Sequence, residues 1–235
     1  AIPRSPRWLV RKGRIEEART VLHLIGEDNA ESELKGMVAS LHLEQGQAAE
    51  RLFSWKYRLP IFLAISIGMF TQLSGINAIL YYLNDIFARA GFSKVSGDLQ
   101  AVAIGATNLL FTAIAMSVID RVGRKKLLLV GAVGTAACLA GVAYIFFTAQ
   151  HEDLLIWLLI GYIAFFAFSQ GAVIWVYLSE VFPTPVRAKG QSLGSFTHWM
   201  MNALISWSFP LIAAASKPAP FCVFSAMCGL QFVVV

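Results

Sequence analysis

The chain has 235 residues, of which 57% are hydrophobic and only 14% charged, and its formal net charge is +5. Soluble domains contain about 25% charged residues, so this composition indicates a membrane protein. A nucleic-acid partner is not expected, because no basic stripe interleaves with exposed aromatic residues. The three cysteines, Cys138, Cys222 and Cys228, lie in apolar runs without metal-ligand spacing, so we expect neither a disulfide nor a metal site.

Residues 1–58 are polar and carry apolar residues at helical spacing. Ser5 and Pro6 predict an N-cap followed by a proline at the first helical position. Two further amphipathic helices are predicted over residues 14–24 and about 31–52. Because none of these segments is apolar enough to cross a bilayer, we expect a small helical domain beside the membrane; a solvated linker is the alternative.

The rest of the chain consists of long uncharged runs separated by short polar connections. A helix of about 20 apolar residues crosses the hydrocarbon core of a bilayer. The runs are 59–84, 99–119, 127–150, 154–179, 190–216 and 218–235, the last of them cut short. We therefore expect an all-α membrane domain of six spans over 59–235. The first residue is not a methionine, and the last run has no polar tail, so we expect an internal piece of a longer protein.

The positive charges are distributed unevenly over the connections between these runs. Of the 19 lysines and arginines, 16 lie in residues 1–58, 120–126 and 180–189, and three lie in the alternate connections. The positive-inside rule places the richer set in the cytoplasm. We expect a multi-pass protein of the plasma (cell inner) membrane with residues 1–58 on the cytoplasmic side.

The first run, 59–84, carries polar residues close to its mid-depth: Gln72, Ser74 and Asn77 surround Gly75. Amides are costly in hydrocarbon unless they have partners, so this part of the helix should face a cavity or another helix. A glycine there also allows the broken helix that transporters use to aim polar groups at a solute. The two interpretations, a solute site and hydrogen bonding between helices, both stay open at this point.

Two cytoplasmic connections combine acidic and basic residues. Residues 120–126 read DRVGRKK, and the segment after 179 reads EVFPTPVRAKG. A positive anchor needs no acid, so these patterns favour ion pairs between helix ends. The expected members are Arg7, Asp120, Arg121, Arg124, Glu180 and Arg187.

These motifs resemble those of the sugar porters of the major facilitator superfamily, along essentially the whole chain. PRSPRWL at 3–9 is similar to that family's PESPRWL, and TQLSGINAILYY at 71–82 to QQLSGINAILYY of its seventh helix. DRVGRKK resembles the signature between helices eight and nine. SQGAVIWVYLSEVFPTPVRAKGQS at 169–192 resembles the tenth-helix segment. The resemblance implies the C-terminal six-helix half of a twelve-helix transporter, similar to bacterial members.

The resemblance also implies a sugar site near the bilayer midplane. Amides can donate and accept hydrogen bonds as sugar hydroxyls do, and indole rings cover the apolar face of a pyranose. The implied substrate-binding residues are Thr71, Gln72, Asn77, Tyr81, Asn108, Gly171, Trp175, His198, Trp199 and Asn202. No catalytic residue is expected, because no nucleophile–base pair or phosphate-binding loop is present.

Four positions depart from the family pattern. Arg4 replaces a glutamate, and Thr71 replaces the first of two glutamines. Ala172 stands where the family has a proline, which would leave this helix straighter. His198 occupies a position of glutamine or asparagine and can titrate near neutral pH; a neutral structural histidine is the alternative.

The implied function is transport of a hexose or pentose by alternating access, together with an N-terminal six-helix half and without a cofactor. Proton symport and facilitated diffusion stay open. The alternatives are a transporter-like sugar sensor and a carrier for another neutral polyol. A carrier of organic cations would be expected to show an acidic residue within a span, and no complete span has one.

Overall fold

The computed structural model describes residues 3–25, 29–46, 51–91 and 94–235. It divides the chain into two compact units, Ala1–Arg51 and Leu52–Val235. The first unit contains α1 (Pro6–Arg11), α2 (Ile15–Leu24) and α3 (Ala30–Gly46). The second contains the long apolar helices.

The first unit is a cluster of three helices, and residues 47–50 of the helix predicted over about 31–52 lie outside the described residues. Pro6 begins α1 as predicted, but the side chain of Ser5 makes no capping hydrogen bond, and only its carbonyl oxygen accepts from Leu9 N. Leu9 and Leu22 are buried between the helices. Arg19 of α2 forms ion pairs with Glu16 and, across to α3, with Glu31. Apolar packing and exposed ion pairs thus hold the unit together.

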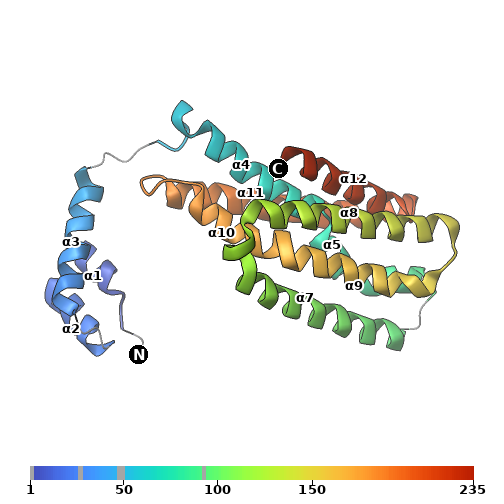
Figure 1. Cartoon of the computed structure of the whole chain (residues 1–235), viewed down its shortest axis with the longest axis horizontal. Helices are drawn as coiled ribbons and strands as arrows, with labels where there is room; N and C mark the ends of the chain where they lie inside the picture. The colour runs from blue at the N-terminus through green and yellow to red at the C-terminus, as the bar shows by residue number, and fades with distance from the viewer. Residues whose placement is uncertain (1–2, 26–28, 47–50, 92–93) are drawn as a thin grey trace. The chain divides into compact units, whose positions relative to one another are not determined.

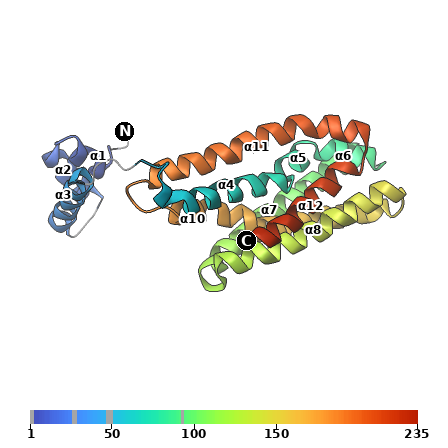
Figure 2. The same cartoon turned by 90° about the horizontal axis from the view of Figure 1, so that it is seen from above.

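The second unit consists of helices that lie side by side along one common direction (Figures 1 and 2). A short 3-10 turn, η1 (Trp55–Tyr57), leads into α4. The remaining elements are α4 (Arg58–Leu73), α5 (Ile76–Tyr81), α6 (Leu83–Arg89), α7 (Lys94–Val122), α8 (Arg124–Thr148), η2 (Glu152–Leu154), α9 (Leu155–Phe166), η3 (Ala167–Gly171), α10 (Ala172–Glu180), α11 (Arg187–Ala215) and α12 (Ala219–Val234). α4 packs along α11, and α8 packs between α9 and α12. These elements correspond to the six predicted runs, so the prediction of an all-helical membrane protein is confirmed.

Among the residues that the structure describes, four helical segments are long and apolar enough to cross a membrane: Trp55–Tyr81, Leu99–Val122, Arg124–Thr148 and Glu152–Glu180. α12 is apolar but has only 16 residues. α11 has 29 residues, yet it is not among those four. Its sequence includes His198 and Asn202, which are buried inside the unit and lower its hydropathy. A polar residue that faces other helices is compatible with a membrane-spanning helix.

Two of the spans are irregular. The first is broken at Gly75, whose φ is +85°, and again at Tyr82. The Ser74 carbonyl oxygen next to the break accepts a hydrogen bond of 3.0 Å from the Tyr162 hydroxyl, so it is not left unpaired in the apolar interior. The second irregular span contains the π-helical turn η3 directly before Ala172. The helix is therefore not regular directly before Ala172, although alanine stands there in place of the family's proline.

Candidate functional site

The site begins with a close contact between α4 and α11. A Cβ on Gly68 would lie 2.9 Å from the carbonyl oxygen of Gly194, so only glycine allows the two backbones to approach this closely. Four residues further along each helix stand Gln72 and His198, on the same faces as the two glycines. The glycine contact thus brings two polar side chains together that are 126 residues apart in sequence.

Gln72 is the centre of a hydrogen-bonded chain. Its Nε2 atom lies 2.9 Å from Nε2 of His198. Its Oε1 atom accepts a hydrogen bond of 3.2 Å from Nδ2 of Asn77. Asn77 lies on α5, beyond the break at Gly75, so the chain connects both segments of the broken helix to α11. Gln72 and His198 are buried, with exposed fractions of 1% and 7%.

Two indole rings lie against the histidine. The ring centroids of Trp175 and Trp199 are each 5.3 Å from that of His198, both in edge-to-face geometry. Trp175 is 47% exposed and Trp199 is 56% exposed, so both rings present an open face. An apolar ring surface beside neutral amides is the combination that suits a polyhydroxylated ring.

A second polar group lies on α11 beyond this cluster. Asn202 Nδ2 lies 3.5 Å from the Tyr81 hydroxyl, and Ser206 donates to Asn202 Oδ1 over 3.1 Å. The hydroxyl of Tyr82 donates to the backbone carbonyl of Ser206 over 3.2 Å. These contacts hold α5 against α11 on the far side of the helix break.

Three of the implied residues are joined to neither group by a hydrogen bond or a ring contact that the structure shows. The hydroxyl of Thr71 donates to Ile67 O within its own helix over 2.7 Å, and its side chain is 1% exposed. Gly171 ends the π-helical turn, where a Cβ would lie 3.2 Å from the ring of Phe166. Asn108 is half-buried on α7, and the contacts described for the Gln72 cluster do not include it.

Gln170 is a polar residue that the sequence analysis did not select. It lies in the π-helical turn, is fully buried, and neither side-chain amide atom has a hydrogen-bond partner among the described residues. Buried amides without partners are rare in native structures, and π-helical turns occur often at functional sites. Its position directly before Gly171 in the tenth-helix motif is the sequence feature that could have identified it as a candidate site residue.

The chemistry of this site is that of neutral recognition. The groups that meet are amides, an imidazole, hydroxyls and indoles, and none of them is a carboxylate or an amine. Within the described residues, no three histidines, cysteines or acids are placed to hold a metal ion. The arrangement can therefore exchange hydrogen bonds with an uncharged solute and cover one apolar face of it.

The predicted ionic residues meet in part, at the helix ends. Arg124 Nη2 lies 2.9 Å from Asp120 Oδ1 and 2.8 Å from Glu180 Oε1, which connects the turn between α7 and α8 to the end of α10. Arg187 instead donates from Nε to the carbonyl oxygen of Phe182 over 3.2 Å. Arg121 is exposed and is not part of the ion pairs described at this end of the unit.

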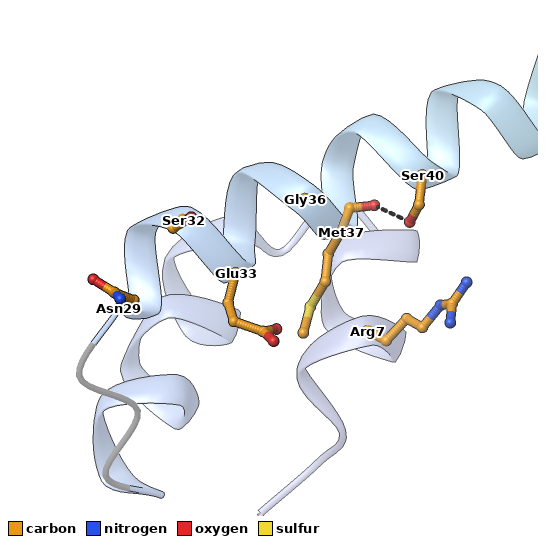
Figure 3. Close-up of a pocket in the computed structure, with 7 residues that line it drawn as sticks. All are labelled: Arg7, Asn29, Ser32, Glu33, Gly36, Met37 and Ser40. Carbon is orange, nitrogen blue, oxygen red and sulfur yellow. Dashed lines mark hydrogen bonds between the residues drawn. The ribbon is translucent and has the colours of Figure 1, made fainter.

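Arg7 belongs to the first unit, where it lines a pocket of about 450 Å³ together with residues of α3 (Figure 3). Glu33 and Met37 project into this pocket from α3, and Arg7 lies beyond Met37 on α1. Its expected role in the ion-pair network of the membrane unit stays a prediction.

We expect the Arg124–Glu180 pair to contribute little to stability, and we expect the effects of replacing its two residues to be coupled. Glu180 is half exposed, and solvent screens such pairs, so their contribution to stability is small. Arg124→Gln and Glu180→Gln should each lower the melting temperature slightly, and the double variant no further than either single variant. Lys126→Gln, at an exposed position of the same turn, is the control. Additive losses in the double variant would show that the two residues act independently.

Comparison with known proteins identifies the family of the chain. The family model "Sugar (and other) transporter" matches residues 1–235. The chain is 33% identical to the arabinose-proton symporter of Bacillus subtilis, covering 100% of the chain and 52% of that protein. It is 36% identical to the glucose facilitated diffusion protein of Zymomonas mobilis, covering 92% of the chain and 46% of that protein.

A solved structure shows the same fold. It is that of the major facilitator superfamily proton:xylose symporter XylE bound to 6-bromo-6-deoxy-D-glucose, with a TM-score of 0.79 and 30% identity. The match covers 99% of this chain and 50% of that one, so the chain spans about half the length of the relatives it matches. The predicted resemblance is confirmed: the chain belongs to the sugar transporter family of the major facilitator superfamily.

Proposed function

We propose that this chain forms the C-terminal half of a membrane transporter for a neutral sugar of the hexose or pentose class. The observation that carries the proposal is the Asn77–Gln72–His198 chain beside two indole rings with open faces. Relatives named for arabinose and glucose transport support a sugar as the solute. The exposure of Trp175 and Trp199 supports a second wall, supplied by an N-terminal six-helix half.

The proposed mechanism is alternating access, in which the two halves rock about the sugar. Because the helix is broken at Gly75, α5 can change its orientation relative to α4, and Asn77 and Tyr81 move with it. The Arg124 ion pairs join helix ends away from the sugar, and we propose that they help to hold the outward-facing state. By the positive-inside rule, these ends and residues 1–58 lie in the cytoplasm of a cell whose inner membrane the protein spans.

Sugar counterflow tests the proposal. Proteoliposomes that contain this chain assembled with an N-terminal half are loaded with unlabelled D-xylose or D-glucose, and entry of the labelled sugar is measured. We expect transient accumulation above equilibrium, and none in vesicles that hold this chain alone, because one wall of the site is absent. Binding of sugar without counterflow would instead support a sensor, and counterflow only with non-sugar polyols would overturn the sugar assignment.

Coupling to protons is a separate question within the same proposal. One relative is named a proton symporter and another a facilitated diffusion protein. The carboxylates of the second unit for which ion pairs are described lie at helix ends. We therefore propose that any proton-carrying carboxylate of a symporter lies in the N-terminal half. Uptake with and without an imposed pH gradient distinguishes symport from facilitated diffusion.

A further inference from the structure

The hydrogen-bonded chain at the site has a definite direction. Asn77 donates from Nδ2 to Oε1 of Gln72, so the NH2 group of Gln72 is the part that faces His198. An amide nitrogen has no acceptor capacity, and the ring nitrogen 2.9 Å away must therefore accept. Nε2 of His198 thus carries no proton in this arrangement, and the neutral imidazole carries its proton on Nδ1.

Nδ1 of His198 is buried and has no hydrogen-bond partner among the described residues. A buried donor without a partner destabilises the protein, because it has given up its hydrogen bonds to water. Trp175 and Trp199 lie against the ring edge-to-face and offer no acceptor atom. The Nδ1–H group is therefore a donor that the described residues leave unused.

No charged side chain is among the contacts that the structure describes for His198. Its described side-chain contacts are Gln72 of α4, Trp175 of α10 and Trp199, and Gly68 lies next to its backbone. Of the titratable groups on the elements packed against α11, Arg58 of α4 lies over the ring of Trp55, and Tyr177 of α10 lines a pocket with Arg124 and Lys125. Tyr81 of α5 meets Asn202, Glu180 at the end of α10 is paired with Arg124, and α12 contributes Cys222 and Cys228.

We propose that His198 makes sugar affinity pH-dependent, and that the binding form is the neutral imidazole with Asn77 donating to Gln72 and Gln72 donating to His198. This inference rests on the proposed function. A proton taken up from water at Nε2 would leave two donors facing each other, so the amide of Gln72 must turn to present Oε1. Its NH2 group then faces Asn77, which must turn in the same way to present Oδ1. Protonation of one ring atom reverses the chain and changes which atom of Asn77 a sugar meets.

Equilibrium binding of labelled D-xylose or D-glucose to the assembled porter, without a pH gradient, tests this. Histidine changes charge between about pH 5 and 8, and we expect the dissociation constant to rise at least about threefold from pH 7.5 to pH 5. In His198→Gln the ratio of the dissociation constants at pH 5 and pH 7.5 should be one, whatever the affinity of the variant, because glutamine does not titrate. The control is His151→Gln, since His151 is exposed and lies outside the site; it should keep the ratio of the unmodified protein. A flat profile in the unmodified protein, or an equal ratio in His198→Gln, would overturn the proposal.

Nitrogen-15 spectra of the histidine side chains give a second reading that does not depend on transport. At pH 8 the signal that disappears in His198→Gln should show protonated Nδ1 and unprotonated Nε2. The opposite tautomer would overturn the direction of the chain, even if sugar binds. If neither sugar binds at any pH, the proposed function and the pH-dependent affinity both fail, and the tautomer at pH 8 then decides only the direction of the hydrogen-bonded chain.

Discussion

Replacing Gly75 with alanine is expected to destabilise the membrane unit by about 2–4 kcal/mol. Two effects add. The φ of +85° is a conformation that residues with a Cβ rarely adopt. A Cβ at this position would also lie 2.2 Å from the ring of Phe224 on α12, and the side chains around that ring are buried.

The matched control is Gly229→Ala, on α12, where an added Cβ meets nothing within 4 Å and the backbone is helical. It should leave the melting temperature in detergent unchanged or slightly raised, because alanine favours a helix over glycine. Phe224→Ala combined with Gly75→Ala should relieve the steric part of the loss but not the backbone part. Equal melting temperatures for Gly75→Ala and Gly229→Ala would show that the break does not depend on glycine.

Much of the fold follows from local properties of the chain. The six uncharged runs contain enough apolar residues to define the helices of the membrane unit, and the glycine among polar residues at 75 marks the first break. The second break at Tyr82 and the π-helical turn at Ala167–Gly171 have no comparable local signal. Both depend on packing against other helices, which a run of apolar letters does not encode.

The candidate site is harder to predict from the sequence for the same reason. Motifs selected Gln72, Asn77 and His198 separately, but their hydrogen bonds depend on the close approach of α4 and α11 at Gly68 and Gly194. Neither glycine belongs to a quoted motif. The motif also implies a role in binding for Thr71. In the structure its hydroxyl donates a hydrogen bond to the carbonyl oxygen of Ile67 in the same helix, as any threonine in a helix can do.

Gln72→Leu is expected to weaken sugar binding about 10–100-fold. The substitution removes both hydrogen bonds of the central amide, leaving Nδ2 of Asn77 and Nε2 of His198 without their partner. In the proposed site the amide also bonds a sugar hydroxyl, and leaving that hydroxyl unpaired costs about 1–3 kcal/mol, with each 1.4 kcal/mol a factor of ten in affinity. The loss of the Asn77 and His198 bonds falls on the unliganded protein as well, so it lowers stability rather than affinity.

Gln231→Leu is the matched control, because the residue type, the burial of 1% and the substitution are the same. Both amide atoms of Gln231 lack partners among the described residues, and it lines a different pocket, beside Lys125 and Leu128. Its replacement removes an unsatisfied polar group, so stability should rise or stay constant and the dissociation constant for labelled D-xylose or D-glucose should not change. Equal affinities in the two variants would mean that Gln72 is a contact between helices only. A loss confined to Gln72→Leu, with melting temperatures that remain comparable, would assign the amide to the solute, because helix contact alone acts through stability.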